Sequence, residues 1–156
     1  MMPEQRPITG AEYGGSAATP TEALARFYAA FNAASLDALA SSWEQSDAIA
    51  MDNPVGGIVR GWAAVRQVYA KLVQGPAKIT VEFYDYTLHE VGDLFYAVGR
   101  ERGKLSVGTR QLALAIRTTR MFRRHGAVWR QVHHHGSMDN PAMLEEYQRL
   151  ILGAPS

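Results

Sequence analysis

Apolar positions recur at two different periods along the chain, and the change between them near Pro76 separates a helical part from a strand-forming part. Before Pro76, apolar residues spaced three or four apart predict helices, because this spacing places them on one helical face. The first helix is expected to begin at Thr19-Pro20, since Thr19 and Glu22 fit a capping box and proline favours the first helical position. Its apolar face consists of Leu24, Phe27, Tyr28 and Phe31.

Two more helices and a strand are predicted in the same part of the chain. Ser35 fits the N-cap of a short helix whose apolar side holds Leu36, Leu39, Ala40 and Trp43. Residues 48–51 predict a strand that is broken by Asn53-Pro54. A third helix is expected to end at Gly75-Pro76, and its apolar residues are Trp62, Val65, Tyr69, Leu72 and Val73.

After Pro76 the apolar period is two, which indicates successive β-strands. We expect strands near residues 79–84 and over 94–102, with a turn at Gly92-Asp93 and a looser connection over 103–108. The next strand is the longest and turns at His125-Gly126 into the last one, over 128–136. One face of that longest strand holds Leu112, Leu114, Ile116, Thr118, Arg120 and Phe122. Asn140-Pro141 then predicts the start of a closing helix.

Helices followed by a run of antiparallel strands indicate an α+β fold. We expect a cone-shaped, curved antiparallel sheet with three N-terminal helices over its concave face and a short C-terminal helix. Residues 1–18 mix proline, glycine and small polar residues without an apolar period, and predict a flexible tail. Residues 19–152 are expected to form one domain. A cavity between helices and a curved sheet is a common place for a small ligand.

Composition and charge exclude several classes of function. The 156 residues contain no cysteine, which rules out thiol catalysis, disulfides and iron–sulfur clusters. A formal net charge of +1 argues against nucleic-acid binding. No apolar stretch is long enough for a membrane span, and no signal peptide is apparent. We therefore expect a cytoplasmic protein that binds neither nucleic acid nor membrane.

Arg120 is the most informative polar position, because alternation places it on the most apolar face in the chain. A buried guanidinium needs a carboxylate partner or an anionic ligand. A structural salt bridge, or an outward-reaching side chain at the strand end, fits equally well. Arg100 shares a face with Tyr96 and Val98 by the same alternation, and two inward arginines would form a carboxylate or phosphate clamp.

Three consecutive histidines, His133-His134-His135, lie on the last strand. Strict alternation places His133 and His135 on one face together with Trp129 and Gln131. Two histidines at this spacing can bind a metal, but further ligands are few, and we expect no metal. They would instead donate hydrogen bonds to a ligand or act as a base near neutral pH. A polar network at a sheet rim or dimer interface is the alternative.

Asp52 ends the first predicted strand, where its carboxylate could face the mouth of the cavity. In apolar surroundings such a carboxyl can act as a general base. A turn residue that bonds its own backbone is the alternative interpretation. Trp43 and Phe27 are expected to line the apolar end of the cavity.

The chain resembles the nuclear transport factor 2-like superfamily from about Pro20 to Pro141. The stretch 26–32 (RFYAAFN) resembles the first-helix motif of that superfamily. Residues 47–55, with Arg60-Gly61 and Ala64-Val65, resemble its ketosteroid isomerase and SnoaL-like branches. Residues 119–126 (TRMFRRHG), with Trp129 and 132–137 (VHHHGS), are similar to the association domain of calcium/calmodulin-dependent protein kinase II.

This resemblance implies a cone-shaped α+β dimer and candidate roles for several residues. Asp52 matches the proton-abstracting Asp of the isomerases, with Asn53 as an extra residue before the proline. Phe27 and Thr118 stand where that family has an oxyanion-holding Tyr and a protonated acid, which argues against steroid isomerisation. Arg100 and Arg120 match pocket arginines of the association domain, whose third pocket arginine is replaced by Gly136. The kinase domain is missing, so the role of a kinase hub does not transfer.

The leading interpretation is a cofactor-independent, dimeric SnoaL-like protein that binds a small organic molecule, anionic or with an enolisable carbonyl. Asp52 or His135 would move a proton, as in isomerases, cyclases or dehydratases. Arg100, Arg120, His133, Tyr96, Trp43 and Phe27 would bind the ligand. A non-catalytic ligand-binding or assembly module is the alternative, and the sequence leaves catalysis itself undecided.

Overall fold

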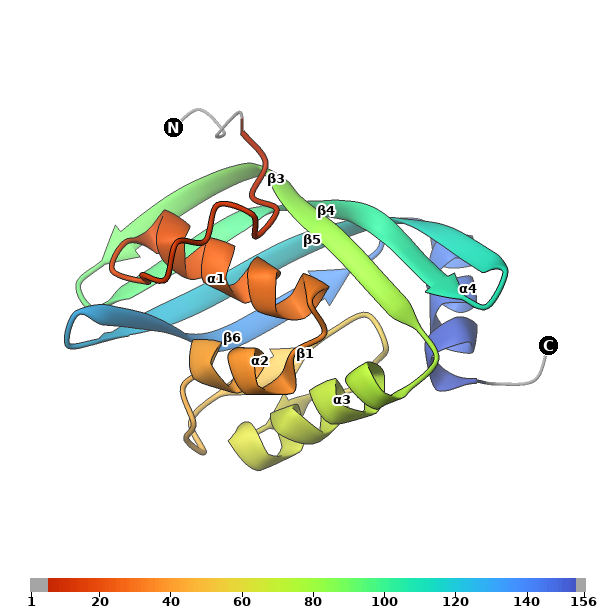
Figure 1. Ribbon diagram of the computed structural model, residues 1–156, viewed down its shortest axis with the longest axis horizontal. Coiled ribbons are helices and arrows are strands. Elements are labelled where there is room, and N and C mark those ends of the chain that lie inside the picture. The colour runs from red at the N-terminus through yellow and green to blue at the C-terminus, as the bar shows by residue number, and fades with distance from the viewer. Residues whose placement is uncertain (1–5, 154–156) are drawn as a thin grey trace.

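A curved six-stranded sheet carries helices on one face in the computed structural model, which describes residues 6–153 (Figure 1). The strand order is β2-β1-β6-β5-β4-β3, and the sheet does not close into a barrel. Helices α1 to α3 cover one face of the sheet, and α4 lies at the end where β4 turns into β5 (Figure 1). The predicted α+β class, with three N-terminal helices and a C-terminal helix, is confirmed.

The helices begin where the capping signals predicted. At the start of α1, the side chain of Thr19 accepts the N–H of Glu22, and the side chain of Glu22 accepts the N–H of Thr19. Ser35 and Asn140 cap α2 and α4 with their side chains, whereas Gly61 precedes α3 without such a bond. The bounds are α1 Pro20–Asn32, α2 Leu36–Ser42, α3 Trp62–Gln74 and α4 Pro141–Leu152.

Strands β3, β4 and β6 are longer than the pattern predicted, whereas the first strand is shorter and the short second strand was not predicted. The strands are β1 Ala50–Asp52, β2 Val59–Arg60, β3 Lys78–Val91, β4 Leu94–Val107, β5 Arg110–His125 and β6 Val128–Ser137. The expected loose connection over 103–108 is wrong, because β4 stays paired with β5 as far as Val107. The glycine that suggested a break, Gly103, lies instead where a Cβ atom would meet the carbonyl oxygen of Thr80 at 1.9 Å. It marks a close approach of two backbones.

One extra residue in β6 decides which side chains face the helices. Met121 pairs with His133, but Phe122 pairs with Gln131, so Val132 is left without a partner in the ladder. Such a bulge breaks the alternation of faces. Trp129 and Gln131 are therefore buried together with His134, whereas His133 and His135 are more exposed. The expectation that His133 and His135 share a face with Trp129 and Gln131 is wrong for this reason.

The described part of the predicted tail packs on the domain. Ile8 is buried and exchanges two backbone hydrogen bonds with Phe83 on the edge strand β3. Ala17 is also buried, and its carbonyl oxygen accepts the N–H of Trp129 at 3.0 Å. The structure thus differs from the expected flexible tail over 6–18, while residues 1–5 lie outside the described residues. Of the helices in the described range, none combines the length and apolar character needed to cross a bilayer.

Candidate functional site

Arg120 lies inside the protein, and each of its three guanidinium nitrogens donates a hydrogen bond to another side chain. Its Nη2 donates to Glu101 Oε2 at 2.8 Å, and its Nη1 donates to Gln131 Oε1 at 2.8 Å. Its Nε donates to the hydroxyl of Tyr28, which in turn donates to Glu101 Oε2 at 2.5 Å. The side chains of Arg120 and Glu101 are only 4% and 5% exposed. The structural salt bridge, one of the two sequence-based interpretations, is therefore present.

The charge of Arg120 is stable in this setting. Burial by itself lowers the pKa of a guanidinium, but the contacts of Arg120 with Tyr28 and Glu101 outweigh burial and raise its pKa. Its guanidinium carbon also lies 3.9 Å from the ring centre of Phe27, a cation–π contact. Arg120 and Glu101 cancel each other's charge, so the pair adds no net charge to its surroundings.

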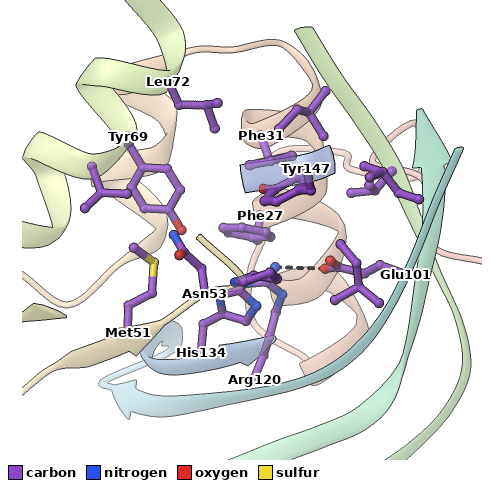
Figure 2. A pocket seen from close by; sticks show the side chains of 16 residues that line it. Phe27, Phe31, Met51, Asn53, Tyr69, Leu72, Glu101, Arg120, His134 and Tyr147 are labelled. Carbon is purple, nitrogen blue, oxygen red and sulfur yellow. Dashed lines mark hydrogen bonds and ion pairs between the residues drawn. The ribbon is translucent and has the colours of Figure 1, made fainter. Parts of the chain in front are cut away.

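A cavity of about 60 Å³ lies beside this salt bridge, between the inner face of the sheet and helices α1, α3 and α4 (Figure 2). That volume holds a few water molecules. Its polar lining residues are Asn53, Tyr69, Glu101, Arg120, His134 and Tyr147, and the rest of the lining is apolar. Figure 2 shows His134 and Arg120 at one end of this cavity and Leu72 and Phe31 at the other.

His134 is the polar group at the cavity whose hydrogen-bonding capacity is unused. Its side chain is buried, and neither ring nitrogen has a hydrogen-bond partner within residues 6–153. Burial lowers the pKa of His134 well below its ordinary value, and the positive charge of Arg120 lowers that pKa further. The imidazole is therefore neutral near pH 7, with one nitrogen able to donate and the other able to accept a hydrogen bond.

Two tyrosines line the same cavity from helices. Tyr69 on α3 accepts a hydrogen bond from Trp43 Nε1 at 3.2 Å, and burial raises the pKa of Tyr69 to about 12. Burial also raises the pKa of Tyr147 on α4, so both phenols are neutral and can donate hydrogen bonds. Gln148 holds α4 in place by donating to the carbonyl oxygens of Pro54 and Val55, both at 3.2 Å.

The outer face of the sheet holds most of the other predicted site residues. Asp52 pairs with His135 in the parallel β1–β6 ladder, and its carboxylate oxygen lies 2.8 Å from Nδ1 of His135. The other carboxylate oxygen of Asp52 lies 3.6 Å from Nε2 of His133, whose Nδ1 contacts the carbonyl oxygen of Ala50. Asp52 thus forms a cluster with the two histidines, whereas its neighbour Asn53 lines the cavity.

Arg100 also lies on the outer face, as do the residues that alternation grouped with it. It forms a salt bridge with Asp85 at 3.1 Å, with side-chain exposures of 51% and 49%. Tyr96 stacks on His89 with ring centres 4.6 Å apart. The shared face of Arg100, Tyr96 and Val98 was correctly predicted, but it faces away from the helices, so no clamp of two inward arginines exists. A wide depression of about 610 Å³ includes Arg100, His133 and His135.

Of the predicted ligand-binding residues, Arg120 and Phe27 line the cavity, whereas Trp43 does not and instead donates a hydrogen bond to Tyr69. Sequence reasoning missed His134, Glu101 and Tyr147. Glu101 could have been found, since it alternates with Phe95 and Ala97, two apolar positions of the same strand. No local signal marked His134, because the bulge at Val132 depends on pairing with β5. Throughout residues 6–153, no three His, Asp or Glu side chains are arranged to hold a metal ion.

Comparison with known proteins identifies the family. The sequence profile of the SnoaL-like domain matches residues 21–141, which is most of the chain. The chain belongs to the SnoaL-like domain family. This SnoaL-like chain has no significant match among the curated proteins.

Solved structures similar to this SnoaL-like domain carry different functional descriptions. A Thiobacillus denitrificans protein assigned as a calcium/calmodulin-dependent protein kinase type II association domain is 28% identical, with a TM-score of 0.66; the match covers 81% of this chain and all of that one. A Streptomyces avermitilis NTF2-like protein assigned as a dehydratase is 22% identical, with a TM-score of 0.67 and coverage of 74% and 89%. The CaMKII hub of S. rosetta is 18% identical, with a TM-score of 0.65 and coverage of 80% and 97%. The last two likenesses show the fold alone, and fold does not determine function.

Proposed function

We propose that this SnoaL-like domain binds a small, uncharged organic molecule in the cavity beside His134, through a carbonyl or hydroxyl oxygen. The observation that carries the proposal is His134 itself, a buried imidazole with two unpartnered nitrogens at the edge of a cavity. Buried polar groups without a partner are rare in folded proteins and commonly mark a site for water or ligand. The phenols of Tyr69 and Tyr147 supply further donors.

Charge balance favours a neutral ligand over a carboxylate. Nε, Nη1 and Nη2 of Arg120 each already donate to a protein acceptor, and Glu101 neutralises its charge. An anion placed beside this pair would gain little attraction and would lose its hydration. The anionic ligand expected from two inward arginines is thereby disfavoured, while a ketone, aldehyde or alcohol needs only the hydrogen bonds that His134 and the tyrosines offer.

Proton transfer is the catalytic step that this arrangement could support. The phenol of Tyr69 or Tyr147 can polarise a carbonyl by donating a hydrogen bond, and the unprotonated nitrogen of His134 can accept the proton from the adjacent carbon. The lowered pKa of His134 makes it a weak base, so the transfer would depend on holding the enol oxygen firmly. The product would be an enol that returns to the ketone or an isomer of it.

Exchange of α-protons for deuterium tests binding and proton transfer together without knowledge of the natural substrate. Small ketones are incubated with the protein in D2O, and loss of the α-proton signal is followed by NMR. We expect exchange faster than in protein-free buffer, and its loss in His134→Gln, which keeps a polar group of similar size. If the α-protons of a ketone exchange too slowly to follow, titration of the protein with that ketone measures binding through changes in the protein's chemical shifts.

His133→Gln is the matched comparison, since His133 is adjacent in sequence but lies on the outer face with Asp52. The proposal would be contradicted if His134→Gln and His133→Gln lost the exchange activity equally. It would also be contradicted if no ketone or alcohol bound to the wild-type protein. The roles predicted for Asp52 and His135 remain predictions that the same assay tests. Loss of exchange in Asp52→Asn with retention in His134→Gln would move the chemistry to the outer face.

Assembly through the outer face of the sheet is a second candidate function. It is supported by the likeness to an association domain at 28% identity. On that face Val98 is an exposed apolar side chain, 44% exposed, at the edge of the wide depression. We propose a homodimer in which two such faces meet, as the sequence resemblance implies.

Sedimentation velocity measures the assembly directly. The wild-type chain is expected to sediment as two copies, and Val98→Glu is expected to sediment as one, because a carboxylate would be buried in the contact. Val91→Glu is the control, since Val91 is 67% exposed but lies at the β3–β4 turn. A monomeric wild-type chain would contradict this second function and leave the first unaffected.

A further inference from the structure

The cavity beside His134 adjoins a second hollow that the proposed function does not use. This second hollow, the apolar groove, has a volume of about 240 Å³ and lies among the C-terminal ends of α1 and α3 and the start of β3. Three side chains line both spaces: Phe31, Leu72 and Ile79. These three side chains therefore lie between the two spaces.

Size alone argues that the inner cavity is only part of a ligand site. Its volume of about 60 Å³ is far below the roughly 300–1,000 Å³ usual for pockets that bind organic ligands. The apolar groove supplies most of the missing volume. Joined, the two spaces would give a site with Arg120, Glu101 and His134 at one end and mainly apolar residues in the groove.

The groove is kept open by small residues. Ala33, Ala34, Gly75 and Ala77 line it where the two helices end and β3 begins. Its polar lining residues are Asn32, Lys78 and Thr80. The amide of Asn32 is already bonded, since it donates to Val81 O at 2.8 Å and accepts the N–H of Val81 at 2.9 Å. Most of the groove's lining residues are apolar and offer contacts to methylene or ring carbons, while Lys78 and Thr80 add polar groups.

The three side chains between the two spaces can move more easily than the core around them. Phe31, Leu72 and Ile79 are partly exposed, in contrast to Phe27 and Val65 on the same helices, which are fully buried. Rotation of an apolar side chain that borders solvent disturbs fewer packed neighbours than rotation in the core. The hydrocarbon chain of a ligand could displace these three side chains without unfolding a helix.

We infer that the ligand is an amphipathic molecule whose carbonyl or hydroxyl group lies at His134 and whose apolar chain passes between Phe31, Leu72 and Ile79 into the apolar groove. This inference rests on the proposed function for the polar end. It adds the substrate class, a neutral oxygen-bearing group on an extended hydrocarbon, and it makes Leu72 a specificity-determining residue for chain length.

A series of straight-chain methyl ketones, from butanone to methyl nonyl ketone, tests the inference by calorimetric titration. Each added methylene that enters the groove is expected to tighten binding by up to roughly fourfold, the equivalent of its transfer from water. In Leu72→Trp the indole should fill the opening, so that affinity no longer rises with chain length while the shorter ketones still bind. In Phe31→Ala, by contrast, affinity should go on rising with chain length up to longer ketones than in the wild-type protein.

Leu150→Trp is the matched control, because Leu150 is a partly buried leucine of α4 that lines neither space. It is expected to keep the wild-type dependence on chain length. His134-dependent binding without any gain from added methylenes would overturn the inference and leave the proposed function standing. If affinity still rises with chain length in Leu72→Trp, the hydrocarbon chain of the ketone binds elsewhere, and this result would also overturn the inference. Absence of binding by every ketone would contradict the proposed function itself.

Discussion

Arg120 and His134 lie directly opposite each other in the β5–β6 ladder, where burial, together with the charge of Arg120, lowers the pKa of His134 and keeps its ring neutral. Glu101, from the neighbouring strand β4, holds Arg120 in its charged form. Three adjacent strands thus present a carboxylate, a guanidinium and a neutral imidazole to the same cavity. The carboxylate and the guanidinium satisfy each other, so the imidazole is left for a ligand.

Removing the guanidinium should destabilise the protein strongly. In Arg120→Met, Glu101 would remain buried without its charged partner, and Gln131 and Tyr28 would each lose a hydrogen bond. We expect the free energy of unfolding to fall by about 3–5 kcal/mol, as for other broken buried ion pairs. Urea denaturation followed by circular dichroism measures this loss.

The double variant Arg120→Met with Glu101→Met separates the ion pair from simple packing. Once both charges are gone, no uncompensated charge is buried, so the double variant should be more stable than Arg120→Met alone. If the double variant instead loses as much free energy of unfolding as the two single variants together, Arg120 and Glu101 do not stabilise each other in this way.

Stability should depend on pH through His134. Its folded-state pKa lies well below the ordinary value of 6.5, so below pH 6.5 the unfolded chain binds a proton that the folded chain does not. Stability is therefore fully present above pH 6.5 and declines as pH falls, with a limiting slope of about 1.4 kcal/mol per pH unit for one proton. Chemical denaturation between pH 7 and about pH 5 measures the slope.

His134→Gln is expected to flatten this part of the profile, since glutamine does not titrate. The contribution from carboxylates such as Glu44, whose pKa is lowered, is common to both proteins and cancels in the difference. An unchanged slope in His134→Gln would mean that another group causes the dependence.

The segment before α1 should detach when Gly10 is changed. A Cβ atom at Gly10 would lie 2.4 Å from the backbone nitrogen of Ala29, and its φ of +96° is unfavourable for other residues. We expect Gly10→Ala to cost about 1–3 kcal/mol and to make residues 6–19 sensitive to protease. Limited proteolysis with mass spectrometry locates the cleavage.

Gly15→Ala is a close control, because Gly15 has the same φ of +96° but no atom near its would-be Cβ. It carries the backbone strain without the collision and should cost about 1–2 kcal/mol without exposing the segment. Equal effects of both changes would show that contact with α1 does not hold the segment in place.

Local signals explain how much of the fold was predictable. The capping box at Thr19, the caps at Ser35 and Asn140 and the spacing of apolar residues each act within one or two turns of chain, and each helix begins where they indicated. The period-two pattern likewise located β3 to β6, although strand ends and the two-residue β2 were missed or misplaced. Strand ends depend on how far a neighbouring strand continues to pair.

The site was predictable only in part. Alternation correctly put Arg120 with the apolar residues and Arg100 with Tyr96, because each pair lies on one strand without a bulge between them. It could not show that Arg100 faces away from the helices, since that depends on which side of the sheet the helices pack. It also could not show that Glu101 is the partner of Arg120.

Local sequence pattern was enough to predict the order of the helices and of all strands except β2, the family resemblance, and the place of Arg120 on the most apolar strand face. Contacts between distant segments, in contrast, set the bulge at Val132 that turns His134 inward and leaves His133 and His135 outside with Asp52. The physical reason is that side-chain direction in a strand alternates locally, whereas a one-residue insertion and the side covered by helices are set by contacts between distant segments.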